Sequence, residues 1–185
     1  MRKILFVASV TVLAACTSNE PAKTDSMTSG ADSTVQTAPA QTINSPYAIN
    51  YSSNFVMGNT KNAEAVLTLW KDWDNGDLSA HKDIFADSVE MRFSDGSVIH
   101  ASRDSVIAAA QNFRSTFSSA VSSVDAILPA KSVDKNEDWA LIWGKEIDTD
   151  KKGKVDSFYL QETWRFNKDG KADLMFQYKQ APAKK

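Results

Sequence analysis

Hydrophobic and polar residues follow three different patterns along the chain. Residues 4–14 form a mostly apolar run, and residues 17–45 are rich in Ser, Thr and Ala with no aromatic residue. Beyond residue 46, apolar positions recur first every three or four residues and then every second residue. These periods predict one folded domain over residues 46–185, with helices before strands. The polar stretch cannot bury enough apolar surface to fold and is predicted to be a disordered spacer.

Three helices are predicted in the first part of this domain. The first begins near Asn59 or Thr60, which both suit an N-cap, and ends at Asn75 before a glycine. A second, short helix is predicted over residues 78–86, and a third after Ser102. The apolar stripes of the first and third helices are Ala63, Val66, Trp70 and Trp73, and Val106, Ala110, Phe113 and Phe117.

The second part of the domain follows the period of two that is typical of strands. Strands are predicted over residues 88–93, 98–101, 121–133, 139–147, 155–166 and 171–179, the third being weak and broken near Pro129. The acidic stretches 134–138 and 148–156 contain lysines and are predicted to be hairpin tips rather than calcium loops. Helices followed by antiparallel strands predict an α+β fold.

The alternation within the strands predicts which residues share a face. The strand 139–147 is apolar on both faces, which favours a central position with its outer face covered by a second copy of the chain. On the last two strands, the faces expected to pack against the helices are Phe158, Leu160, Glu162, Trp164 and Phe166, and Ala172, Leu174, Phe176 and Tyr178.

Three short motifs in this order resemble the nuclear-transport-factor-2-like superfamily, with its polyketide-cyclase-like and ketosteroid-isomerase-like members. They are Trp70 with Gly76-Asp77-Leu78, residues 84–89 (IFADSV) and residues 163–171 (TWRFNKDGK). The resemblance implies a cone-shaped barrel of strongly bent antiparallel sheet packed on three N-terminal helices. It also implies a pocket at the open end and a homodimer formed through the outer sheet face.

The first sixteen residues resemble the signal of a bacterial lipoprotein. Arg2 and Lys3 precede the apolar run, which ends in Leu13-Ala14-Ala15-Cys16. The resemblance implies cleavage after residue 15, acylation of Cys16 and a membrane as partner, followed by a tether over residues 16–45. Thr17, in place of aspartate, implies the Gram-negative outer membrane, facing the periplasm or the cell surface. The alternative is an ordinary secretory signal with an unrelated cysteine.

Composition excludes several classes of function. With a single cysteine the chain has no intramolecular disulfide, and with only two histidines it has no Cys/His zinc cluster. The formal net charge of −2 argues against a nucleic-acid partner. We found no P-loop, nucleophile elbow, metal motif or cofactor motif.

Glu162 is the main candidate for chemistry, because it is the only ionisable residue on an otherwise apolar strand face. A buried carboxylate there would act in acid–base chemistry or anchor a ligand. The structural alternatives are a salt bridge to Arg92 or Arg114, or a bulge that turns Glu162 outward. His100 is a second catalytic candidate, as a base paired with Asp87 or Asp104, although its place before a helix cap favours a surface histidine.

A pocket for a small apolar or aromatic ligand is predicted around Glu162. Its other predicted members are Trp70, Trp73, Phe93, Trp143, Trp164 and Tyr178, although core packing is the favoured explanation for the tryptophans. His81 is predicted to face solvent. Ketosteroid-isomerase chemistry does not carry over, because the family's proton-shuttling aspartate and oxyanion-hole tyrosine fall at Phe93 and Leu69.

The sequence therefore favours a membrane-anchored lipoprotein with a non-catalytic domain, which binds a small ligand or serves in dimerisation. The alternative is a small cyclase-, dehydratase- or hydrolase-like enzyme that uses Glu162 with His100 or Tyr178. A third possibility is a purely structural domain with a closed cavity.

Overall fold

The computed structural model describes residues 43–180, so Cys16, the predicted signal peptide and most of the predicted tether lie outside the described residues. The elements are β1 (Phe55–Met57), α1 (Thr60–Asn75), the short 3-10 helix η1 (Lys82–Ile84), β2 (Phe85–Phe93), β3 (Val98–Ser102), α2 (Arg103–Arg114), β4 (Phe117–Ser132), β5 (Glu137–Asp150), β6 (Val155–Phe166) and β7 (Ala172–Gln180). No helix in this part of the chain is long and apolar enough to cross a membrane.

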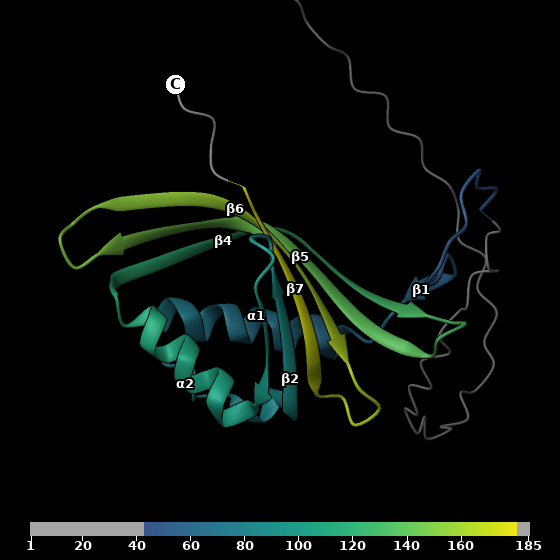
Figure 1. Ribbon diagram of the computed structural model, residues 1–185, viewed down its shortest axis with the longest axis horizontal. Helices are drawn as coiled ribbons and strands as arrows, with labels where there is room; N and C mark the ends of the chain where they lie inside the picture. The colour runs from purple at the N-terminus through teal and green to yellow at the C-terminus, as the bar shows by residue number, and fades with distance from the viewer. Residues whose placement is uncertain (1–42, 181–185) are drawn as a thin grey trace, which may run out of the picture. The chain divides into compact units, whose positions relative to one another are not determined.

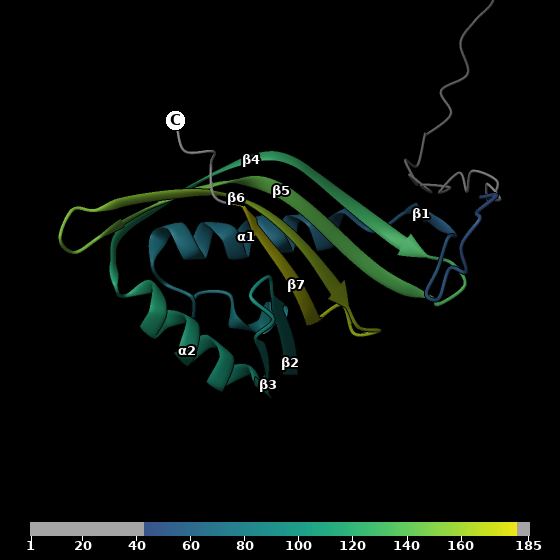
Figure 2. The ribbon, with the colours of Figure 1, turned by 45° about the horizontal axis from the view of Figure 1, so that its top comes forward.

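The seven strands form one curled sheet in the order β1-β4-β5-β6-β7-β2-β3. The long strands β4 and β5 bend along their length, and α1 lies against the concave face of the sheet (Figures 1 and 2). The α+β architecture predicted from the sequence is confirmed, with β5 in the interior of the sheet. One pair of strands departs from the antiparallel prediction, because β2 lies parallel to β7.

Helix α1 forms where its pattern predicts it. The Asn59 side chain accepts a hydrogen bond from the Lys61 backbone N–H at 3.0 Å, which caps the first turn. Gly76 ends the helix in the left-handed conformation, with φ of 75°. Val66, Leu69 and Trp70 are buried on the face toward the sheet.

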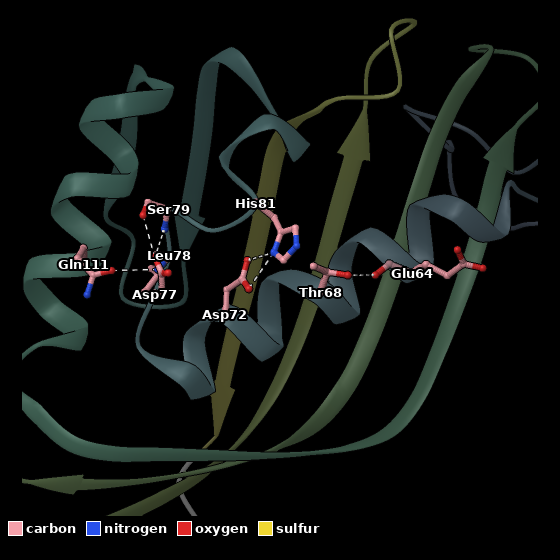
Figure 3. Close-up of polar contacts among 8 residues, drawn as sticks. All are labelled: Glu64, Thr68, Asp72, Asp77, Leu78, Ser79, His81 and Gln111. Atoms are coloured by element: carbon pink, nitrogen blue, oxygen red, sulfur yellow. Dashed lines mark hydrogen bonds and ion pairs between the residues drawn. The ribbon is translucent and has the colours of Figure 1, made fainter.

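The predicted helix over residues 78–86 is wrong. Only the three residues of η1 are helical, and β2 already begins at Phe85. Side chains outside this segment satisfy its backbone, since Gln111 accepts a hydrogen bond from the Leu78 N–H and donates one to the Gly76 carbonyl. Asp77 in turn accepts bonds from the backbone and hydroxyl of Ser79 (Figure 3). These local bonds replace those of a helix.

Strand β4 begins four residues earlier than predicted and ends one residue earlier, at Ser132. Phe117, expected on the helix before it, is its first residue, and the strand continues through Pro129. The Pro129 carbonyl accepts a bond from the Gly58 N–H at 3.1 Å, so the main-chain groups of Pro129 point away from β5. The missing N–H of proline therefore removes no bond of the β4–β5 ladder.

The predicted inner face of β7 is wrong beyond its first residue. Ala172 is fully buried opposite Phe166, but the pairing register shifts between Arg165 and Phe166. This irregularity adds one residue to β7 and reverses the alternation that follows. Met175, Gln177 and Lys179 consequently face inward, whereas Leu174, Phe176 and Tyr178 lie on the outer face.

Candidate functional site

A cavity of about 550 Å³ lies between the two α-helices and the concave face of the sheet. Its walls are mostly apolar, which is typical of sites for small molecules. Its aromatic members are Trp70, Trp73, Phe85, Phe93, Phe113, Phe158 and Trp164, and its acidic members are Asp72, Asp95, Glu146, Asp148 and Glu162.

Glu162 lies in this cavity, buried and hydrogen-bonded through both carboxylate oxygens. Its Oε2 accepts bonds from the indole N–H of Trp70 at 2.7 Å and of Trp164 at 2.9 Å. Its Oε1 accepts a bond from the Gln177 amide at 2.8 Å, across the β6–β7 pair. Three donors thus compensate the loss of water around this side chain. Neither Arg92 nor Arg114 pairs with it, because Arg92 contacts Glu90 and Arg114 binds main-chain carbonyls.

Gly144 positions Trp70 for this contact. A Cβ atom at Gly144 would lie 2.9 Å from the Trp70 ring and 2.3 Å from the Ser123 carbonyl oxygen. Only a residue without a side chain therefore lets the Trp70 ring of α1 lie directly on β5.

A second acidic group, the Glu146–Asp148 pair, lies further along the inner face of β5. Both residues are buried, with exposed fractions of 6% and 4%. The Trp73 indole donates a hydrogen bond to Glu146 Oε1 at 2.7 Å. Asp148 Oδ1 is buried without a hydrogen-bond partner.

Burial raises the pKa of both acids in this pair. For Glu146 the loss of water is the main cause and the hydrogen bond to Asp148 the next, and together with the negative charge of Asp148 they raise the pKa to about 8. Burial also raises the pKa of Asp148, against the lowering effects of its bond with Glu146 and of Lys179 and Arg114. Because the two acids interact this closely, their titration belongs to the pair rather than to either residue.

The sequence prediction placed Asp148 in a hairpin tip and gave Glu146 no role. Strand β5 instead runs to Asp150, so Gly144, Glu146 and Asp148 continue the inner face of Ala140 and Ile142. The predicted strand 139–147 already contained Glu146, and extending its alternation by one residue would have added Asp148 to the face that lies toward the same cavity as Glu162. The charged residues 145–150 hid that signal, because they are typical of turns.

The cavity includes five of the seven predicted pocket residues and excludes the other two. Trp70, Trp73, Phe93, Glu162 and Trp164 line it. Trp143 and Tyr178 do not, since Trp143 lies on the outer face of β5, and Tyr178 on that of β7 with 55% of its surface exposed.

His100 does not lie in the cavity. It is exposed on β3, and its Nε2 is 3.1 Å from the Ser88 hydroxyl. The two aspartates considered as partners for it, Asp87 and Asp104, lie near Arg103 instead. Neither His100 nor Tyr178 is therefore placed to work with Glu162.

His81 contacts a buried carboxylate, although its ring is otherwise open to solvent as predicted. Its Nδ1 lies 3.0 Å from both carboxylate oxygens of Asp72 on α1 (Figure 3). Asp72 is buried, while 54% of the His81 side chain is exposed. This contact ties the segment before η1 to α1.

No three histidine, cysteine, aspartate or glutamate side chains between residues 43 and 180 converge as a metal site.

No family model and no curated protein sequence matches the chain. Solved structures do match its fold. An LEH-like epoxide hydrolase of M. tuberculosis is 13% identical with a TM-score of 0.53, the match covering 65% of this chain and 84% of that one. An NTF2-like protein of unknown function from Burkholderia pseudomallei is 19% identical with a TM-score of 0.51, covering 63% and 88%.

A putative SnoaL-like polyketide cyclase from Jannaschia sp. CCS1 is 13% identical with a TM-score of 0.51, covering 65% of this chain and 85% of that one. These identities are too low to transfer an activity, but the shared architecture includes the bent sheet packed on helices. The chain therefore has the nuclear-transport-factor-2-like fold, as the three sequence motifs indicate.

Proposed function

We propose that the protein is a membrane-anchored accessory domain that binds a small, largely apolar molecule without transforming it. The cavity carries this proposal, because a space of about 550 Å³ with aromatic walls suits an organic ligand. Glu162, the catalytic candidate of the sequence, supports a binding role. Its two oxygens already accept three hydrogen bonds, which leaves it suited to fixing Trp70 and Trp164 rather than to transferring protons.

A fluorescent apolar probe tests this proposal. N-phenyl-1-naphthylamine should bind to the protein saturably with one site per chain, and Ala110→Phe should weaken binding because Ala110 lines the cavity. Ala108→Phe, on the exposed side of the same helix α2, is the matched control and should bind like the parent. Absence of saturable binding, or equal binding by the two variants, would contradict the proposal.

An acid–base enzyme is the second candidate function, and the Glu146–Asp148 pair is the observation that favours it. A Glu146 pKa of about 8 keeps a proton available at neutral pH, as a general acid requires. Since the fold is shared with an LEH-like epoxide hydrolase, styrene oxide is a reasonable first substrate. Hydrolysis that Glu146→Gln abolishes would support this candidate, whereas a bound but unchanged epoxide would favour binding alone.

We also propose that acylated Cys16 anchors the domain to the Gram-negative outer membrane. Two observations in the sequence support this: the Leu-Ala-Ala-Cys motif behind a short apolar run, and Thr17 rather than aspartate after it. The spacer predicted over residues 17–45 would hold the domain away from the lipid headgroups, since a random coil of 29 residues spans roughly 30 Å.

A homodimer through the outer sheet face is a further part of the proposal. Apolar side chains remain exposed there, including Val121 at 59%, Tyr159 at 48% and Tyr178 at 55%. Native mass spectrometry at micromolar concentration tests it, and a spectrum with monomer alone would contradict it.

A further inference from the structure

The acidic pair in the cavity receives few hydrogen bonds from other residues, which constrains the chemistry of the ligand. Outside the pair itself, Glu146 receives one donor, the Trp73 indole, while the buried Asp148 Oδ1 receives none. A buried oxygen without a partner is unfavourable unless something bound in the cavity supplies a donor. The carboxylates of Glu146 and Asp148 therefore favour a ligand that donates hydrogen bonds.

The charge around this pair points to a ligand that is also positive. Glu146, Asp148 and Glu162 all line the same cavity. Between residues 43 and 180, no lysine, arginine or histidine nitrogen lies within 4.0 Å of any of these three carboxylates.

Lys179 and Arg114 are the cations whose charge acts on Asp148, and neither forms an ion pair with it. Lys179 lines the same cavity, where its ammonium lies over the ring of Phe158, another wall residue, 3.2 Å from the centroid. Arg114 donates to the main-chain carbonyls of Trp73, Asp74 and Phe117.

The aromatic walls suit the same kind of ligand. Trp70, Trp73 and Trp164 line the cavity beside the acids, and their ring faces attract cations that have lost water. The cavity is far larger than a metal ion needs, and the described residues contain no group of three metal ligands. An ion with an organic body fits this arrangement better than a bare one.

We infer that the ligand is a small organic cation, whose protonated amine donates hydrogen bonds to the Glu146–Asp148 pair while its apolar body lies among the tryptophans. This inference rests on the proposed binding function and specifies the class of ligand. Binding would supply the donor that Asp148 Oδ1 lacks and would pair a buried negative charge.

Three probes of matched shape and different charge test the inference: 1-naphthylmethylamine, 1-naphthalenemethanol and 1-naphthoic acid. Each is titrated against the protein at neutral pH by displacement of N-phenyl-1-naphthylamine. We expect the amine to bind about tenfold more tightly than the alcohol, and the carboxylate to bind most weakly. Equal affinities for amine and alcohol would overturn the inference while leaving the binding function intact. If neither the displaced dye nor any probe binds, both fail.

Two variants identify the responsible group. Asp148→Asn should remove the preference for the amine over the alcohol while the alcohol still binds. Asp125→Asn, which neutralises an exposed acid on β4 outside the cavity lining, should keep the preference. A preference that survives Asp148→Asn, or that Asp125→Asn removes, would contradict the proposed contact. If Asp148→Asn does not fold, Glu146→Gln, which changes the same pair, takes its place together with the parent's three affinities.

Discussion

At the scale of single residues, the main feature of the molecule is a row of buried carboxylates on the inner sheet face. They differ in how they are satisfied: Glu162 accepts three hydrogen bonds, whereas Glu146 and Asp148 share few donors and have raised pKa values. Glu162 stabilises the site through its three hydrogen bonds, whereas the Glu146–Asp148 pair can still accept hydrogen bonds from a ligand. Glu162 and the pair are therefore expected to respond differently to substitution.

Stability should depend on pH through Glu146. Its folded-state pKa of about 8 exceeds the ordinary value of 4.5, so the folded state binds the additional proton between these values. The free energy of unfolding should consequently fall as pH rises from about 5 to 8. The groups facing the pair are Lys179, Arg114, Asp156 and Glu162.

Glu146→Gln should flatten this dependence and raise stability at pH 8, since the amide can still accept the Trp73 bond. Urea unfolding at several pH values measures the effect, with exposed Glu64→Gln on α1 as the control. An unchanged slope in Glu146→Gln would show that this group does not carry the dependence.

Removing one donor from Glu162 should destabilise the fold. Trp70→Phe deletes the indole N–H at 2.7 Å and leaves the buried carboxylate with two donors, at a cost of about 1–3 kcal/mol. Trp143→Phe, the same change on the outer face of β5, should cost less. Chemical denaturation compares the two variants, and equal losses would argue against a specific role for the Trp70 bond.

At the scale of the elements, the sequence predicted regular segments well and irregular ones poorly. Helix α1 follows its apolar period and its capping residues, so its ends matched the prediction. The segment after it has turn geometry because Gln111, distant in sequence, satisfies its backbone. The irregularity opposite Arg165 similarly reverses the faces of β7 without a local signal. Contacts between residues distant in sequence determine the turn after α1 and the faces of β7. The sequence therefore placed Tyr178 in the pocket, although it lies on the outer face.

His81 and His100 should differ in how much they stabilise the protein, because only His81 contacts a buried carboxylate, that of Asp72 on α1. His81→Ala would leave the buried Asp72 without its partner and should destabilise the protein by about 1–2 kcal/mol. His100→Ala removes only an exposed contact with Ser88 and should cost little. Thermal unfolding at pH 7 distinguishes them, and a His100 effect as large as that of His81 would refute this difference.

At the scale of the whole molecule, the proposal joins an anchor, a tether and a binding domain. The anchor depends on one residue, because Cys16 is the only cysteine in the chain. Cys16→Ser should move the protein from the membrane to the soluble fraction, since its acyl chains would be lost. Fractionation with and without globomycin measures this, and an unchanged distribution in both would contradict the lipoprotein proposal.

The central claim, that the concave face of the sheet holds a small ligand, is tested most directly by a crystal structure with N-phenyl-1-naphthylamine bound. For crystallisation, the protein would begin at residue 16 and carry Cys16→Ser, so that no lipid is attached. We predict density for the probe between α1, α2 and β5–β7, against Trp70 and within reach of Glu146. A cavity closed by its own side chains, or a probe bound only to the outer sheet face, would contradict the claim.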